Sequence, residues 1–274
     1  MQLTLCRALG ERRVIDSEGF HKEGVVKSAA RVLMVLELFD VLCREAPVSE
    51  VAELLGFPQS STSVLLRSMA AIGYLKYNKA TRAYIPTAKV SLLGRWLNGP
   101  AVKDGAVLQM MERINRKTDL CTVLAARNRT QAQYIHVIQK SGTDRTFVIK
   151  GVLRSLIASS VGYCFLADDE DAEIKRLAVR INSENAQPDQ RVSVSGLMAE
   201  IEQVRRNGYA MTTGLVTSDG GMISMPLPVR VGGERLVVGV GGLSRCLIER
   251  KDEIIAIMQQ EIGEFADFDV SCRD

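Results

Sequence analysis

Hydrophobic and polar positions recur at helical spacing over two short neighbouring segments, residues 48–55 and 60–72. The first segment carries one apolar stripe and stops at Gly56, and Ser60 or Ser61 could cap the second. The apolar face of the second segment consists of Thr62, Leu65, Leu66, Met69 and Ile72. Its opposite, small and polar face consists of Ser60, Ser63, Val64 and Arg67. Two helices joined by a sharp turn predict a helix-turn-helix, whose second helix enters the major groove of DNA.

The next segments alternate with a period of two. Residues 74–77 and 83–85 flank a polar turn and predict a β-hairpin that ends at Pro86. This hairpin would be the wing of a winged helix-turn-helix, with cationic side chains at its tip that a DNA backbone would attract. The residues that we expect to contact DNA are Lys27, Arg31, Ser60, Ser61, Thr62, Ser63, Arg67, Lys76, Lys79 and Arg82.

A longer helix is predicted before the helix-turn-helix, over residues 28–45. We expect its core stripe to consist of Ala29, Val32, Leu33, Leu36, Phe39 and Leu42. A second apolar stripe contains Met34, Leu38 and Val41. A helix that is apolar on two sides needs a second partner, either another helix or another subunit.

The remaining chain mixes helices and strands. Helices are predicted over residues 88–97, 102–116, 168–180, 195–207 and 247–265, and strands over 120–126, 132–138, 146–149, 209–213, 223–229 and 236–240. Asn98-Gly99-Pro100 is the expected domain boundary, because Gly and Pro interrupt helices. This order predicts an α+β fold with a mainly antiparallel sheet.

Charge supports a DNA partner for the first part of the chain. The formal net charge is only +3, but residues 24–100 hold nine Lys or Arg against five Asp or Glu, and residues 101–274 hold 22 against 23. The six cysteines lack any Cys-x-x-Cys and the two histidines lack ligand spacing, so we expect a reducing cytoplasm and no metal or cofactor. No apolar run approaches the ~18 residues of a membrane span, and no signal peptide is evident.

Five local sequences, in order, resemble those of the IclR family of bacterial transcriptional regulators. They are residues 55–62 (LGFPQSST), 156–162 (LIASSVG), 205–210 (RRNGYA), 223–228 (ISMPLP) and 238–242 (VGVGG). The resemblance implies a flexible extension (1–23), a winged helix-turn-helix domain (24–86), a linker helix (87–100) and a GAF-like effector-binding and oligomerisation domain (101–274). It also implies a homodimer or tetramer on a palindromic operator in double-stranded DNA and a carboxylate-bearing or aromatic metabolite as effector. Of the two signs of regulation, which the sequence does not give, we expect repression.

The same resemblance places the effector pocket. Carried over position by position, its lining would be Ser160, Val161, Thr212, Met222, Gly239 and Gly241. The chain departs from the family pattern, since Ile157 stands where His is common, Val64 where Arg is, Met222 where Cys is, and the two glycines where Ser is. We therefore expect a less polar pocket and a larger, more apolar ligand.

Two other classes of function stay open. An enzyme would need a nucleophile and a base, for which the only pair that we find is Cys121 and His136, both in predicted strands with nothing to orient them. The glycines of residues 239–242 lack the spacing and the βαβ context of a nucleotide-binding loop. A winged helix that binds protein and never DNA is the second alternative, and it predicts that no duplex is retained at any salt concentration.

Overall fold

The structure is a computed structural model that describes residues 25–93, 105–139, 148, 150–184, 191–231 and 233–271. The chain divides into two compact units, Met1–Trp96 and Leu97–Asp274, which we describe separately. The predicted boundary at residues 98–100, the extension at 1–23 and most of the strand at 146–149 lie outside the described residues. No helix of the described part is long and apolar enough to cross a membrane.

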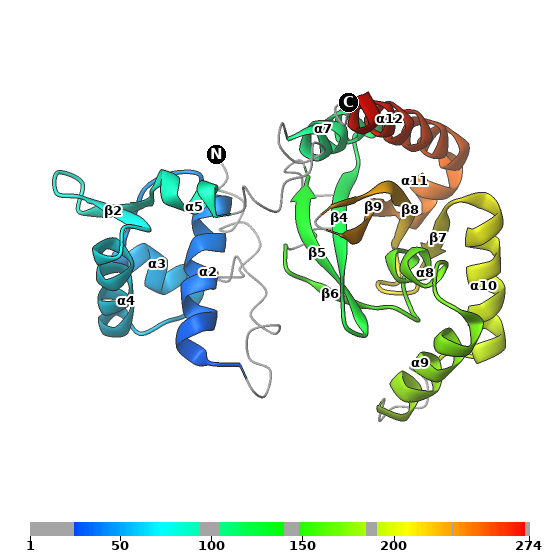
Figure 1. Ribbon diagram of the computed structural model, residues 1–274, viewed down its shortest axis with the longest axis horizontal. Coiled ribbons are helices and arrows are strands. Elements are labelled where there is room, and N and C mark those ends of the chain that lie inside the picture. The colour runs from blue at the N-terminus through cyan, green and yellow to red at the C-terminus, as the bar shows by residue number, and fades with distance from the viewer. Residues whose placement is uncertain are drawn as a thin grey trace. The chain divides into compact units, whose positions relative to one another are not determined.

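The N-terminal unit is a winged helix-turn-helix (Figure 1). Its elements are α2 (Lys27–Leu42), β1 (Ala46–Pro47), α3 (Val48–Leu55), α4 (Gln59–Ala71), β2 (Leu75–Asn78), β3 (Ala83–Pro86) and α5 (Ala88–Leu92), with an antiparallel sheet in the order β1-β3-β2. Helix α3 ends because Gly56 takes a left-handed conformation with φ 67°, which costs glycine little. The α3–α4 turn and the wing were thus predicted correctly.

Three details of the N-terminal unit differ from the prediction. Helix α2 buries Met34 and Leu38, whereas Leu33, expected inside, is 53% exposed. Both stripes of α2 are apolar, so the helical spacing of its apolar residues could not predict which stripe packs against α3 and the sheet. Ile72 is also exposed, because α4 ends one residue before it. Helix α4 begins at Gln59 and no side chain caps it, so the predicted serine caps are wrong.

The C-terminal unit is built on a six-stranded antiparallel sheet in the order β6-β5-β4-β9-β8-β7. Its strands are β4 (Cys121–Asn128), β5 (Gln131–Ile138), β6 (Leu153–Ser155), β7 (Ala210–Thr213), β8 (Gly220–Val231) and β9 (Glu234–Leu243). Its helices are α7 (Ala106–Thr118), α8 (Ser160–Leu166), α9 (Asp171–Glu184), α10 (Val194–Asn207), α11 (Ser244–Glu249) and α12 (Lys251–Ser271). The α+β class is confirmed, but β6 was not predicted, and the last predicted helix is two helices that meet at Arg250.

The two faces of this sheet carry separate cores. Helices α7 and α12 pack on one face, around residues such as Met110, Ile223 and Met258. Helices α8 and α10 pack on the other, around residues such as Val123 and Leu197, and α9 packs against α10. The candidate ligand pocket lies on the face that α8 covers.

Candidate DNA-binding surface and ligand pocket

Helix α4 presents a small polar face to solvent. Ser60, Val64 and Arg67 are exposed, and Ser61 and Ser63 are half-buried. Thr62, which we expected to contact DNA, is 1% exposed, and its hydroxyl donates to the carbonyl of Pro58 over 3.0 Å. Thr62 therefore belongs to the core face of α4, where its apolar neighbours Leu66 and Met69 lie, and cannot touch a base in this conformation.

The wing carries its cations on an anchored hairpin. Lys76, Lys79 and Arg82 are all exposed. Asn78 accepts a hydrogen bond from the backbone N–H of Ala80 over 3.0 Å and donates to Glu45 over 3.1 Å, which ties the turn to the body of the unit. Arg82 has a left-handed backbone with φ 54°, uncommon for a residue with a side chain.

The two predicted contacts on α2 differ in their surroundings. Lys27 is exposed at the first residue of the helix. The guanidinium of Arg31 lies 4.8 Å from the centre of the Phe57 ring, in the turn between α3 and α4. The structure thus brings Arg31 next to the helix-turn-helix turn, where cation–π contact orients it.

A cavity of about 90 Å³ lies between the sheet, the start of α8 and the β7–β8 loop. Four of the six predicted effector residues line it: Ser160, Thr212, Met222 and Gly241. Val161 does not, because it is fully buried in the core beneath α8. Gly239 does not either, because the side chain of Met222 covers it. Val161 and Gly239, which we expected to line the pocket, therefore do not line it.

Sequence reasoning missed several lining residues, among them Tyr134, Arg154, Ser159, Leu215, Val216 and Thr217. Leu215 and Val216 are 48% and 47% exposed, so the loop presents aliphatic groups to solvent as well as lining the cavity. The expectation of a less polar pocket considered only six positions, and the missed residues include a cation and three further hydroxyls. Arg154 was missed because β6 was, and a lone arginine in a three-residue strand gives no signal of its own.

Most polar groups of the pocket already have protein partners. The hydroxyl of Ser159 donates to Ser155 and accepts from the N–H of Gly162, which caps α8, and the hydroxyls of Ser160 and Ser224 are 2.8 Å apart. Arg154 differs, since the contacts of its guanidinium within the described residues are with the neighbouring carbonyl of Leu153, to which it donates, and with Tyr134, whose ring centre lies 5.6 Å away. Within the described part of the chain, no acidic side chain forms an ion pair with it. A half-buried guanidinium of this kind can bind a carboxylate through two parallel hydrogen bonds.

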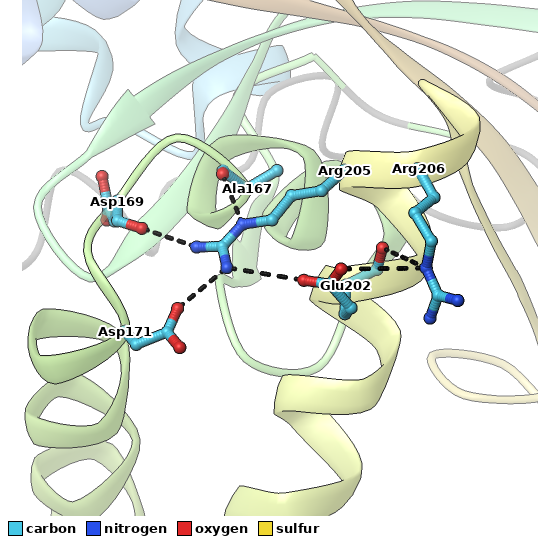
Figure 2. Close-up of polar contacts among 6 residues, drawn as sticks. All are labelled: Ala167, Asp169, Asp171, Glu202, Arg205 and Arg206. Carbon is cyan, nitrogen blue, oxygen red and sulfur yellow. Dashed lines mark hydrogen bonds and ion pairs between the residues drawn. The ribbon is translucent and has the colours of Figure 1, made fainter.

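Helix α8, which forms one wall of the pocket, is fixed at both ends. A Cβ at Gly162 would clash with the backbone of Leu156, so only glycine allows this close approach. Beyond its other end, Arg205 on α10 donates to the carbonyls of Ala167 and Asp169 over 2.9 and 2.8 Å and pairs with Asp171 (Figure 2). The wall is therefore held in place before any ligand binds.

The enzyme alternative gains no support from Cys121 and His136. Cys121 is buried, and burial raises the pKa of its thiol to about 12, so it is not a thiolate at neutral pH. His136 lies on β5 opposite Leu124 on β4, and Cys121 on β4 faces Gly241 on β9. The buried, neutral thiol of Cys121 lacks the activation that a nucleophile needs.

Fold and site together define a DNA-binding winged helix followed by a domain with a small pocket against its sheet. The family model described as bacterial transcriptional regulator IclR C-terminal matches residues 105–260, and the IclR helix-turn-helix domain matches residues 28–79. The chain therefore belongs to the IclR family of transcriptional regulators, with a DNA-binding helix-turn-helix and a C-terminal effector domain. The resemblance found in the sequence is confirmed.

Two characterised relatives and one solved structure illustrate the match. The transcriptional regulator KdgR of Escherichia coli is 25% identical over 244 residues, 85% of this chain and 90% of that protein. The transcriptional regulator XynR of the same organism is 22% identical over 187 residues, 68% of this chain and 74% of that protein. An IclR homologue from Microbacterium hydrocarbonoxydans, solved in complex with 4-hydroxybenzoate, shares the fold with a TM-score of 0.61 at 16% identity, over 89% of this chain and 99% of that one.

Proposed function

We propose that this protein binds a palindromic operator as a homodimer or tetramer, and that a small carboxylate-bearing metabolite in the pocket changes its affinity for that operator. We infer a carboxylate-bearing ligand from Arg154, a half-buried cation that lines the pocket. The hydroxyl groups around it already form hydrogen bonds largely within the protein. The domain limits remain predictions from the sequence, namely residues 87–100 as the linker helix, of which the structure describes residues 87–93 with α5, and 101–274 as the effector-binding and oligomerisation domain.

The DNA half of the proposal rests on the polar face of α4 and the cationic wing. Ser60, Ser63 and Arg67 are available to base edges and phosphates, and Lys79 and Arg82 to the backbone. One recognition helix offers few base contacts, so a selective site requires two copies related by a two-fold axis. An asymmetric single half-site in a footprint would contradict this part.

The ligand half rests on the chemistry of the pocket. Arg154 and the hydroxyl groups suit an acid, and Tyr134, Leu215, Val216 and Met222 suit an apolar or aromatic body. The 4-hydroxybenzoate bound by the Microbacterium homologue is one compound of this class. A ligand that favours one arrangement of the paired DNA-binding units changes operator affinity by about 5- to 150-fold in typical cases.

Repression is the sign of regulation that we propose, because a protein bound over a promoter excludes other proteins from it. A reporter downstream of the selected operator tests this directly. Expression should fall when the regulator is supplied and should return with the effector, whereas a rise on supplying the regulator alone would identify an activator.

The experiment for the whole proposal starts from a duplex selected by the full-length protein from a random library. Its binding is measured by fluorescence anisotropy at several salt concentrations, with and without benzoate, 4-hydroxybenzoate and short aliphatic acids. We expect salt-dependent binding and a change of affinity with at least one acid. Arg154→Gln should weaken binding of that acid about 10- to 150-fold, and Arg206→Gln, an exposed arginine on α10, should not. If no duplex is retained, the winged helix binds something other than DNA.

A further inference from the structure

On one side of the ligand pocket, the long side chain of Met222 lies against two glycines, of which Gly241 lines the cavity and Gly239 does not. Met222 on β8 pairs with Gly241 on β9, and Gly239 lies two residues before it on the same strand. A Cβ placed on Gly239 would lie 2.8 Å from Sδ of Met222, and one placed on Gly241 would lie 2.9 Å from its Cε. Real Cβ atoms essentially never come so close, so the thioether occupies the space that side chains at 239 and 241 would need.

A hydrogen bond holds the Met222 side chain in this position. The hydroxyl of Tyr134 donates to Met222 Sδ over 3.4 Å. Tyr134 is 3% exposed, and its burial raises the pKa of its hydroxyl, which therefore stays protonated and remains a donor at neutral pH. Met222 itself lines the cavity, so one side of its side chain faces the ligand space while the other covers the glycines.

Methionine suits this position because it is unbranched and flexible, fills irregular gaps and can move. We propose that Met222 is a specificity-determining residue, a plug that lies over Gly239 and beside Gly241 at one end of the pocket and so limits the length of the ligand. The inference rests on the proposed function, because it requires that the pocket bind an acid. Tyr134 contacts Arg154 with its ring and Met222 with its hydroxyl, so the acid group and the far end of the ligand lie along one tyrosine side chain.

The first test measures the affinity of the full-length protein for straight-chain carboxylates from acetate to decanoate by calorimetry. In the wild type, affinity should rise about fourfold with each methylene that is buried and stop rising when the chain reaches Met222. Met222→Ala removes roughly three heavy atoms, so the rise should continue for about two or three more carbons. An unchanged limit in Met222→Ala would overturn the proposal.

The matched control is Met211→Ala. Met211 is a half-buried methionine on β7 that packs against the core on the opposite face of the sheet. The same substitution there should leave the chain-length limit at its wild-type value. A limit that shifts equally in both variants would indicate general loosening of the domain and would also overturn the role of Met222.

A second variant tests the contact between plug and glycine. Gly241→Ala adds a Cβ that meets only Cε of Met222 at 2.9 Å and the carbonyl of Gly221 at 3.6 Å. It should push the thioether into the cavity and lower the chain-length limit by about one carbon. The affinity for the longest acid that the wild type accepts should therefore fall about fourfold. In a Met222→Ala background the same change should be tolerated without that loss. Equal losses in both backgrounds would contradict the contact.

Xenon provides a readout that needs no acid to bind, since it enters dry apolar cavities opened by large-to-small substitutions. In Met222→Ala, xenon should shift the amide resonances of Gly239 and Gly241, and in Met211→Ala it should leave them unchanged. If xenon enters Met222→Ala but none of the acids binds the wild type, the proposed ligand class is wrong, whereas the position of Met222 over Gly239 is supported. If xenon leaves both resonances unchanged in a folded Met222→Ala variant, the plug is wrong whatever the ligand.

Discussion

The two units place their candidate functional side chains differently with respect to their cores. In the N-terminal unit, Arg67 and the wing cations project from the far side of elements whose other face is packed. In the C-terminal unit, Ser160 is 1% exposed, and Tyr134 and Gly241 are buried within the same face of the sheet that the core covers. Substitutions at the first site should therefore change binding alone, whereas those at the second should change binding and stability together.

The largest effect should come from the wall of the pocket. Gly162→Ala places a Cβ against the backbone of Leu156, so α8 must move away from the turn that joins it to β6. We expect the free energy of unfolding to fall by about 3 kcal/mol, at the upper end for overpacking, because the backbone cannot yield as a side chain could. Chemical denaturation of the full chain measures it.

The control for this change is Gly196→Ala on α10, where a Cβ meets only Ser193 at 3.6 Å and beyond. It should be neutral or stabilise by up to about 1 kcal/mol, since alanine is favoured over glycine in helices. Equal destabilisation by both substitutions would mean that the close approach of α8 and Leu156 contributes little.

On the DNA side, substitutions should separate into two kinds. Arg67→Ala should cost about 1–3 kcal/mol at the selected site and relax base preference. Lys79→Ala with Arg82→Ala should weaken binding to all duplexes and reduce the slope of log K against log salt by about 2. Arg245→Ala, an exposed arginine on α11, is the control that should change neither. Wing variants that alter base preference while Arg67→Ala does not would reverse the assignment.

A buried charge on the other face of the sheet should affect stability but not ligand binding. Burial alone would raise the pKa of Glu261, but hydrogen bonds from Lys117 and Arg113 outweigh it and lower that pKa. Glu261 thus stabilises the fold above its unfolded-state pKa, and this contribution is lost as pH falls through the folded-state pKa. Glu261→Gln should cost about 1–2 kcal/mol at neutral pH, and the difference should shrink in acid.

Thermal unfolding of both proteins across pH checks this prediction. The control is Glu249→Gln, because Glu249 pairs with Arg245 on the surface and should contribute less than about 0.5 kcal/mol. A difference between wild type and Glu261→Gln that stayed constant down to pH 3 would contradict the proposed linkage.

The smallest effect separates two neighbours on α4. Thr62→Val removes the hydroxyl that bonds the Pro58 carbonyl and should cost about 1 kcal/mol of stability without changing base preference. Ser63, the next residue, is half-buried, and Ser63→Ala should change base preference while leaving the free energy of unfolding nearly unchanged. Base preference that changed in Thr62→Val would mean that this threonine reaches DNA after all.

The sequence predicted the N-terminal unit better than the ligand pocket of the C-terminal unit. The helix-turn-helix and wing rest on local signals, namely Gly56, the stripe of α4 and the alternation before Pro86, so they could be predicted. The orientation of α2 could not, because two of its stripes are apolar and only its packing decides between them. The pocket needs contacts between distant segments, such as Tyr134 with Met222, which no local pattern encodes.

Coupling between the pocket and the DNA-binding surface is tested most directly through the reciprocity of linked equilibria. The dissociation constant of the best-binding acid is measured for the free protein and for the protein saturated with its selected operator. We predict a change of about 5- to 150-fold, equal to the factor by which the same acid changes operator affinity. An acid that binds in the pocket with the same dissociation constant in both states would contradict the account.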